Sequence, residues 1–531
     1  MYNDTYSCVM GCDFLSQNAW ILLAFGIYFL VMLGIGAFYY KRTKSSSDYF
    51  LGGRSLGGWV AAMSAQASDM SGWLLMGLPG AIYAAGTGQI WIGVGLAIGT
   101  MLNWIFISKR LRRYTIVSGN SVTLPTYFQN RFKSSNKVLS VASAVFIMIF
   151  FLVYTASGFS AVTKLFVEVF HLDYVLALAI GAVVIVGYTF LGGFLAVCWT
   201  DFVQGMMMLV ALLAIPILAV GLLGGPSETF QLLESNAPAN YLNPFVNADG
   251  SPMTFVQLIS QLAWALGYFG MPHILVRFMA IRSDSEVKKS RVIAIVWVVL
   301  ALIAASLAGI IGRVYLTTPL EGGATENVFI NSILQMFTEH WYLPFLAGIL
   351  LCGILAAAMS TADSQLLVTA SSFSEDIYKN VIDKKASNKK MIWIGRITVL
   401  VVAIIAFLIA LNPENSVMGL VSNAWSGFGS AFGATVVLSL FWKRANYAGA
   451  VSGVISGGLT VIIWDYIPLF AGQTLSTATG LYSLAVGFPV SLVFIIIVSL
   501  LTKKPSQEVL EEFELAASSK EIDIPVKNEI I

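Results

Sequence analysis

The chain has 531 residues, of which 57% are hydrophobic and only 11% are charged, and its formal net charge is +2. This composition indicates a polytopic membrane protein and leaves no hydrophilic stretch long enough for a soluble domain. The net charge gives no sign of nucleic-acid binding, and the sequence has no G-x-x-x-x-G-K-[ST] phosphate loop that would couple it to ATP. The four cysteines lack metal-ligand spacing, although Cys8 and Cys12 could form one small disulfide.

Thirteen apolar segments are each long enough to cross about 30 Å of hydrocarbon. They lie near 18–40, 57–85, 89–109, 137–168, 173–193, 197–224, 252–280, 290–316, 342–374, 391–411, 416–442, 445–467 and 477–502. The first is too long for the core of a signal peptide, so we expect a true span. An odd number of spans places the two termini on opposite sides of the membrane.

The basic residues predict the orientation. Of the 30 Lys and Arg, all but Lys164 and Arg313 fall in or beside alternate loops and the C-terminal tail. Because cytoplasmic loops carry an excess of Lys and Arg, we expect the N-terminus and Pro226–Ser251 outside. By the same rule Glu375–Lys390 and the tail lie in the cytoplasm. The tail is charged and poor in aromatics, which predicts a solvated helix that fades into disorder.

The segment Ser64–Gly80, SAQASDMSGWLLMGLPG, places an aspartate inside an apolar span. A carboxylate there costs roughly 2.5–3.5 kcal/mol on insertion scales, so Asp69 needs a partner or water. Its small neighbours leave room for the helix to unwind, and freed carbonyls and hydroxyls are ligands that small cations prefer. We interpret this stretch as a sodium site on a broken helix. The alternative is a close helix–helix contact in which Asp69 hydrogen-bonds across the interface.

A second polar run interrupts the ninth span, where Cys352–Thr369 reads CGILAAAMSTADSQLLVT. Three residues spaced i, i+3 and i+4 share one helix face, and a fourth continues that face by one turn. These residues are Ala357, Ser360, Thr361 and Ser364. A single Ser or Thr in a membrane helix usually bonds back to its own i−4 carbonyl, which is the alternative here. A second intramembrane acid, Asp363, favours a cation site.

Five longer runs closely resemble the sodium:solute symporters, and within that family the members that carry proline. These runs are GRSLGGWVAAMSAQASDMSGWLLMGLPGAIY, YTASGFSAV, GGFLAVCWTD, WALGYFGMPHILVRFMA and AAAMSTADSQLL. The resemblance covers Tyr49 to Arg444 with the flanking spans. It implies an all-α polytopic membrane protein of about 13 transmembrane helices with a leucine-transporter-like core of 5+5 inverted repeats, each beginning with a broken helix.

The same resemblance divides the chain into five parts. Residues 1–44 would hold the outer N-terminus and a peripheral first helix, 45–224 the first inverted repeat and 225–444 the second. Residues 445–502 would form two peripheral helices, and 503–531 a cytoplasmic tail.

Carried over position by position, the resemblance implies that a sodium ion lies between the second and ninth spans. Its ligands would be the backbone carbonyls of Ala67, Met70 and Ala357 and the hydroxyls of Ser360 and Thr361. Asp69 would hold the ion from just outside this ligand shell. Five oxygens suit a monovalent cation, whereas divalent ions ask for more carboxylates.

On the substrate side, the resemblance implies an aromatic wall that suits the pyrrolidine ring of proline. Its residues would be Tyr154, Trp264, Tyr268 and Pro272. Pro272, with Gly267 and Gly270, gives the seventh span the means to unwind. Aromatic residues in membrane helices are otherwise more often packing or interfacial residues.

Two further predictions concern charged residues. Some relatives carry a second ion site below the first, and its ligands would fall at Asp201, Ser360, Asp363 and Ser364, which leaves the sodium stoichiometry open. The motif GGRSLGG resembles a cytoplasmic gate region in which Arg54 could pair with an acid such as Asp201. An ordinary positive-inside residue is the alternative for Arg54.

We therefore expect sodium-coupled uptake of L-proline by alternating access in the cell membrane, with lipid around the protein and neither nucleic acid nor an obligate protein partner. We do not expect an enzyme. The alternative within the same class is symport of another small organic solute, such as pantothenate, a sugar or a carboxylate. A receptor would need a signalling domain, and a channel would need a lined pore, for which the scattered acids give little support.

Overall fold

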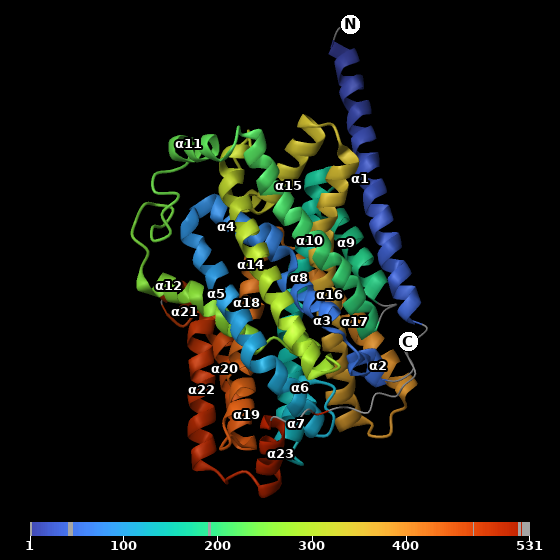
Figure 1. The fold of residues 1–531 in the computed structure, drawn as a ribbon, viewed down its shortest axis with the longest axis vertical. Helices are drawn as coiled ribbons and strands as arrows, with labels where there is room; N and C mark the ends of the chain where they lie inside the picture. The colour runs from blue at the N-terminus through green and yellow to red at the C-terminus, as the bar shows by residue number, and fades with distance from the viewer. Residues whose placement is uncertain (1–2, 41–45, 190–192, 471, 519–521, 523–531) are drawn as a thin grey trace.

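The computed structural model describes residues 3–40, 46–189, 193–470, 472–518 and 522, and these form a bundle of helices (Figure 1). The side chains of Cys8 and Cys12, and hence their pairing, lie outside the described residues. No β-strand forms in the described ranges, where only isolated bridges occur. An all-α membrane fold is the expected outcome, since helices satisfy every backbone hydrogen bond within one segment.

Ten helical stretches in the described ranges are long and apolar enough to cross a membrane. They contain α1 (Asn3–Tyr40), α5 (Ile90–Leu102) with α6 (Ser108–Val117), α8 (Val138–Phe170), α10 (Phe194–Leu222), α14 (Asp284–Tyr315), α16 (Pro344–Ser371), α17 (Asn388–Ala410), α18 (Val417–Phe428) with α19 (Ala434–Phe441), α20 (Tyr447–Tyr466) and α22 (Ser483–Leu501). The expected number of thirteen is therefore not confirmed, because three of the predicted spans are not single long helices.

Two of these three spans are broken helices. The second span consists of α3 (Gly58–Gly72), a π-helical turn and α4 (Leu78–Ala85). The seventh consists of α12 (Phe255–Leu262), a 3₁₀ stretch and α13 (Pro272–Ala280). The fifth span contains α9 (Tyr174–Thr189), which is only 16 residues long. Backbone that leaves the helix at membrane depth is tolerated where protein surrounds it, and it is typical of transport sites.

The broken helix α3 and the polar helix α16 lie in the interior. Every residue from Val60 to Gly72 and from Leu350 to Ser371 is buried. α16 packs against α1, α3, α8 and α10. By contrast, α1, α20 and α22 expose large apolar side chains, as a surface in contact with lipid would, and α20 and α22 pair with each other at one flank (Figure 1). Polar residues therefore gather where lipid is excluded.

The short helices lie at the two ends of the bundle (Figure 1). One end carries α11 (Pro226–Asn236) and α15 (Val328–Leu334), and the other carries α2 (Ser46–Leu51), α7 (Leu124–Arg131) and α23 (Gln507–Ala517). The Ser260 hydroxyl of α12 donates to the carbonyl of Gly480, the residue after α21 (Leu475–Thr479), at 3.4 Å. The tail is less solvated than predicted, because α23 packs on α6 and buries Phe513 against Tyr114. The stretch from Glu375 is helical as far as Ile382.

Candidate functional site

The helix α3 breaks at Ser71, inside the stretch predicted to hold sodium. Ser71 has φ 35° and ψ −172°, a conformation that a non-glycine residue rarely adopts and that persists only when its surroundings impose it. At the next residue, Gly72, a Cβ would lie 2.6 Å from the Cβ of Ala161 on α8. The break therefore falls where the backbone passes too close to α8 for a side chain. Met70 lies at this break, and its carbonyl accepts the N–H of Trp73.

Oxygen atoms of α3 and α16 meet beside the break. The Ser360 hydroxyl donates to the Ala67 carbonyl at 2.8 Å and lies 3.3 Å from the Ala357 carbonyl oxygen. The next hydroxyl along α16, that of Thr361, is buried without a hydrogen-bond partner among the described residues. A buried polar group left unpaired costs about 1–3 kcal/mol, which a bound cation would remove. These groups are four of the five expected sodium ligands, and the Ser360 hydroxyl brings the Ala67 and Ala357 carbonyls to one place.

Asp69 is buried, and two tyrosines contact it. The Tyr268 hydroxyl donates to Asp69 Oδ2 at 2.7 Å, and the Tyr154 hydroxyl donates to the Asp69 main-chain carbonyl at 3.1 Å. Both tyrosines belong to the predicted substrate wall. The structure therefore joins the predicted ion site and the predicted substrate site through a single residue of the broken helix.

Trp264 is 4% exposed and lies in a cluster of aromatic rings. Its ring centroid is 6.0 Å from that of Trp73, 6.3 Å from that of Trp425 and 5.5 Å from that of Tyr482. The indole N–H of Trp425 donates to the Trp264 carbonyl at 2.8 Å. The sequence reasoning missed Trp73, Trp425 and Tyr482, because their contacts join spans that lie far apart in the chain. Their only local signal is that each is an aromatic residue next to small or polar ones.

The seventh span is shaped by its glycines and by Pro272, as predicted. A Cβ on Gly267 would lie 2.0 Å from Nε1 of Trp425, so only glycine lets the 3₁₀ stretch approach α18. Met271 is extended, with φ −77° and ψ 106°, and α13 begins at Pro272. Proline at the first helical position loses no helical hydrogen bond, so Pro272 restarts the helix after the break. In the structure Pro272 therefore shapes the backbone of the seventh span.

Arg277 on α13 was not among the predicted site residues, yet it lies between Asp201 and two serine hydroxyls. Arg277 Nη2 lies 3.1 Å from Asp201 Oδ2 and donates to the Ser364 hydroxyl at 2.5 Å. Its Nε donates to the Ser64 hydroxyl at 3.1 Å. All four side chains are fully buried. A signal for Arg277 existed, because a charge inside an apolar span is as costly for arginine as for aspartate.

Arg54 does not pair with Asp201, so that prediction is wrong. Arg54 Nη1 instead donates to the carbonyl of Met279 at 2.5 Å, and its Nε donates to Oδ1 of Asn120 at 2.8 Å. The guanidinium is occupied by α6 and the loop after it, because Nη1 also lies 3.1 Å from Thr115 Oγ1 and Nη2 donates to the Ser121 carbonyl at 2.8 Å. Burial, and then the charge of Arg112, lowers the pKa of Arg54 to about 9, so the guanidinium stays protonated at neutral pH.

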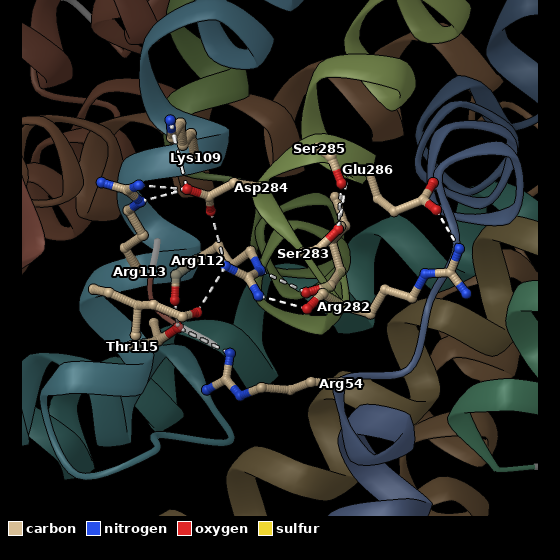
Figure 2. Close-up of polar contacts among 12 residues, drawn as sticks. Arg54, Lys109, Arg112, Arg113, Thr115, Arg282, Ser283, Asp284, Ser285 and Glu286 are labelled. Carbon is tan, nitrogen blue, oxygen red and sulfur yellow. Dashed lines mark hydrogen bonds and ion pairs between the residues drawn. The ribbon is translucent and has the colours of Figure 1, made fainter. Parts of the chain in front are cut away.

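A basic cluster surrounds this loop and ties α6 to the start of α14 (Figure 2). Asp284 lies 2.9 Å from Arg112 Nη1, 2.5 Å from Arg113 Nη2 and 3.5 Å from Lys109 Nζ. The Leu56 amide donates to the Ala280 carbonyl at 3.1 Å, and the Gly58 amide donates to Glu286 at 2.6 Å. The contact of Leu56 holds the residues before α3 against the end of α13, and the contact of Gly58 holds the start of α3 against the first turn of α14.

Comparisons with known sequences identify the family. A family model described as the sodium:solute symporter family matches residues 49–457. The osmoregulated proline transporter OpuE of Bacillus subtilis (strain 168) is 44% identical over 487 residues, which are 92% of this chain and 96% of that protein. The sodium/proline symporter of Escherichia coli (strain K12) is 43% identical over 499 residues, which are 93% of this chain and 95% of that protein.

Comparisons with solved structures agree with the fold. A Na⁺-coupled sialic acid symporter in a substrate-bound, outward-open state superposes with a TM-score of 0.73 at 23% identity, covering 92% of this chain and 99% of that one. MhsT in complex with L-phenylalanine gives a TM-score of 0.53 at 15% identity, covering 83% of this chain and 97% of that one. At these identities the likeness concerns the fold, which is that of the leucine-transporter-like proteins.

Proposed function

This chain belongs to the sodium:solute symporter family, and we propose that it uses the inward movement of Na⁺ to take up L-proline across the cell membrane. It is a transporter and not an enzyme. Symport of pantothenate, a sugar or a carboxylate is not favoured, because relatives at 43–45% identity are named as proline transporters.

The observation that carries this proposal is the hydrogen bond of 2.7 Å between Tyr268 and Asp69. We assign Na⁺ to the oxygens of Ala67, Met70, Ala357, Ser360 and Thr361, with Asp69 just outside the ligand shell. We assign proline to the aromatic wall of Tyr154, Trp264 and Tyr268, with Pro272 as a shaping residue. An ion that orders the last turn of α3 would fix Asp69, and Asp69 would in turn orient Tyr268 toward the substrate.

The mechanism we propose is alternating access around these two sites. Na⁺ binding stabilises the outward-open state, so coupling is a difference in affinity between two conformations. One charge moved through ~100 mV is worth ~2.3 kcal/mol, and a tenfold sodium gradient adds ~1.4 kcal/mol. One Na⁺ per proline would then support roughly 500-fold accumulation, since every ~1.4 kcal/mol is a factor of ten.

We further propose the orientation and the organisation of the chain. The distribution of Lys and Arg supports an outer N-terminus and a cytoplasmic tail. The broken helices α3–α4 and α12–α13 support inverted repeats at 45–224 and 225–444, each of which would begin with one of them. The exposed apolar faces of α1, α20 and α22 support lipid contact at the periphery.

The test is uptake of labelled proline into proteoliposomes that contain the purified protein. An inward sodium gradient should drive accumulation above equilibrium, and an equal potassium gradient should not. Unlabelled proline should compete, whereas pantothenate, glucose and acetate should not. Uptake that ignores the sodium gradient, or that one of these other solutes blocks better than proline does, would reject the proposal.

A further inference from the structure

A cavity of about 380 Å³ opens at the end of the bundle that carries α7 and α23 (Figure 1). Its walls come from the residues after α7, the start of α20, the connection from α22 to α23 and the first turn of α23. Three lysines line the cavity, Lys133, Lys503 and Lys504, and no acidic residue of the described chain does so. A cavity whose charged lining is entirely cationic is suited to an anion.

Two of these lysines lack a counter-charge within the described ranges. Lys503 and Lys504 form no ion pair with any described residue. Lys133 is paired with Glu508 and with Glu512, whose carboxylate lies 2.8 Å from the lysine Nζ. Neither glutamate lines the cavity. The cavity therefore keeps a positive charge that the described side chains do not neutralise.

The backbone that carries the two lysines is held in place by α20. Asn446 is 8% exposed and caps α20, because its side chain accepts the Gly449 amide at 2.9 Å. The side-chain amide of Asn446 donates to the Thr502 hydroxyl and to the Lys503 carbonyl, each at 2.7 Å. These buried contacts fix the connection between α22 and α23, so the two lysines extend from a defined position.

The lysines also follow directly on an apolar surface. The last two residues of α22, Leu500 and Leu501, are 59% and 81% exposed, and α22 lies at one flank of the bundle (Figure 1). Basic residues immediately beyond an apolar span lie at the depth of the lipid headgroups, where they attract anionic lipids. A ligand at this position therefore meets hydrocarbon on one side and cations on the other.

We propose that this cavity binds the phosphate-bearing headgroup of an anionic phospholipid. Lys503 and Lys504 bind the phosphate, and an acyl chain lies along Leu500 and Leu501. The first turn of α23 supplies amide donors as well, since Ser506 precedes that helix and makes no side-chain capping hydrogen bond. A free phosphate ion shares the charge chemistry of the headgroup but not its apolar contact. The cavity contains none of the residues assigned to sodium or proline, so this inference stands apart from the proposed function.

The test is equilibrium binding of a fluorescent phosphatidylglycerol to the purified full-length protein in detergent. Lys503→Gln/Lys504→Gln should raise the Kd for this lipid at least tenfold, because it removes both unpaired charges. Lys384→Gln/Lys385→Gln is the matched control, since it removes two adjacent exposed lysines that lie before α17 and do not line the cavity. Its Kd should equal that of the wild type. An equal rise in Kd for both variants, or no rise for either, would overturn the proposal.

The choice of lipid tests the charge. Phosphatidylcholine with the same fluorescent group carries a phosphate but no net charge, so the wild type should bind it at least tenfold more weakly than phosphatidylglycerol. Equal Kd values for the two lipids would overturn the proposal. Equal melting temperatures of the wild type and both lysine variants show that a change in Kd does not arise from unfolding.

Competition distinguishes a lipid from a soluble phosphate. Inorganic phosphate and glycerol 3-phosphate, each in about hundredfold excess over the lipid, should leave phosphatidylglycerol bound, because neither contacts Leu500 or Leu501. Sodium sulfate at equal ionic strength controls for the screening of charges by salt. Displacement of the lipid by either phosphate compound, but not by sulfate, would assign the cavity to a soluble phosphate and reject the phospholipid.

Discussion

The Tyr268 hydroxyl donates a hydrogen bond to the Asp69 carboxylate across 2.7 Å, although 199 residues separate them in the chain. Tyr268 lies in the 3₁₀ stretch between α12 and α13, and Asp69 lies in the last turn of α3. The bond therefore joins the breaks of the two broken helices. Because binding of two linked ligands is reciprocal, a change at either end of this bond should appear in both affinities.

Tyr268→Phe should raise the proline concentration for half-maximal uptake and also the sodium concentration, each by about tenfold. The variant leaves Asp69 buried without its side-chain donor, and a lost hydrogen bond to a charged group is worth about 1.5–3 kcal/mol. Paired uptake curves for the two ligands measure both effects. Tyr482→Phe is the control, since its hydroxyl donates to the Ser422 carbonyl and not to Asp69. A shift confined to proline would show that the bond does not couple the sites.

Asp69→Asn should raise the sodium concentration for half-maximal uptake by an order of magnitude or more while expression stays near the wild-type level. Asparagine keeps the shape and can still accept the Tyr268 hydrogen bond, so the loss isolates the charge. Sodium titration of proline uptake measures it. If sodium dependence were unchanged, Asp69 would be a structural residue.

Thr361→Ala should weaken sodium binding by roughly tenfold or more without lowering thermal stability. The hydroxyl makes no hydrogen bond within the described structure, so its removal leaves no buried partner unpaired. Sodium isotherms without proline and melting curves measure the two effects. Thr369→Ala is a matched control on the same helix, because its hydroxyl bonds to the Gln365 carbonyl. Equal loss in both variants would argue against Thr361 as a ligand.

Trp264→Ala should raise the KM for proline by an order of magnitude or more and leave sodium binding without substrate nearly unchanged. Losing a buried aromatic contact costs on the order of 1.5–3 kcal/mol. Bulky imino-acid analogues should be tolerated better by this variant than by the wild type. Trp393→Ala, at a ring that is 51% exposed on α17, controls for loss of an indole. Parallel loss of both ligands would indicate a general folding defect.

Single cysteines in a cysteine-free background should report the orientation. Ser251→Cys should react with an impermeant thiol reagent added outside intact cells, whereas Asn380→Cys should react only after the membrane is opened. The reason is that the basic residues flank the second position and are absent around the first. Labelling of Asn380→Cys by the reagent added outside intact cells would contradict the predicted orientation.

The family, the all-α membrane fold and the two broken helices could be predicted from the sequence. The length of an apolar segment, which predicts a membrane span, can be read from that segment alone. A helix break is likewise favoured by adjacent residues, such as Ser71 with Gly72 or Gly270 with Pro272. The face of Ala357, Ser360 and Thr361 follows from helical spacing alone. The number of thirteen spans is not confirmed, because ten stretches of the described residues are single long helices, and small residues divide two of the other predicted spans into shorter helices.

Partners across the bundle were decided only by the tertiary structure. Asp201 carries no local sign of whether it meets Arg54 or Arg277, since both arginines lie in motifs that fit the family. Packing settles the choice: α13 and α10 bring Arg277 Nη2 within 3.1 Å of Asp201 Oδ2, whereas the Arg54 guanidinium bonds to Thr115 of α6 and to the Met279 carbonyl. A buried charge must find its counter-charge in space. The sequence shows that the counter-charge is needed, but packing between distant helices selects which residue supplies it.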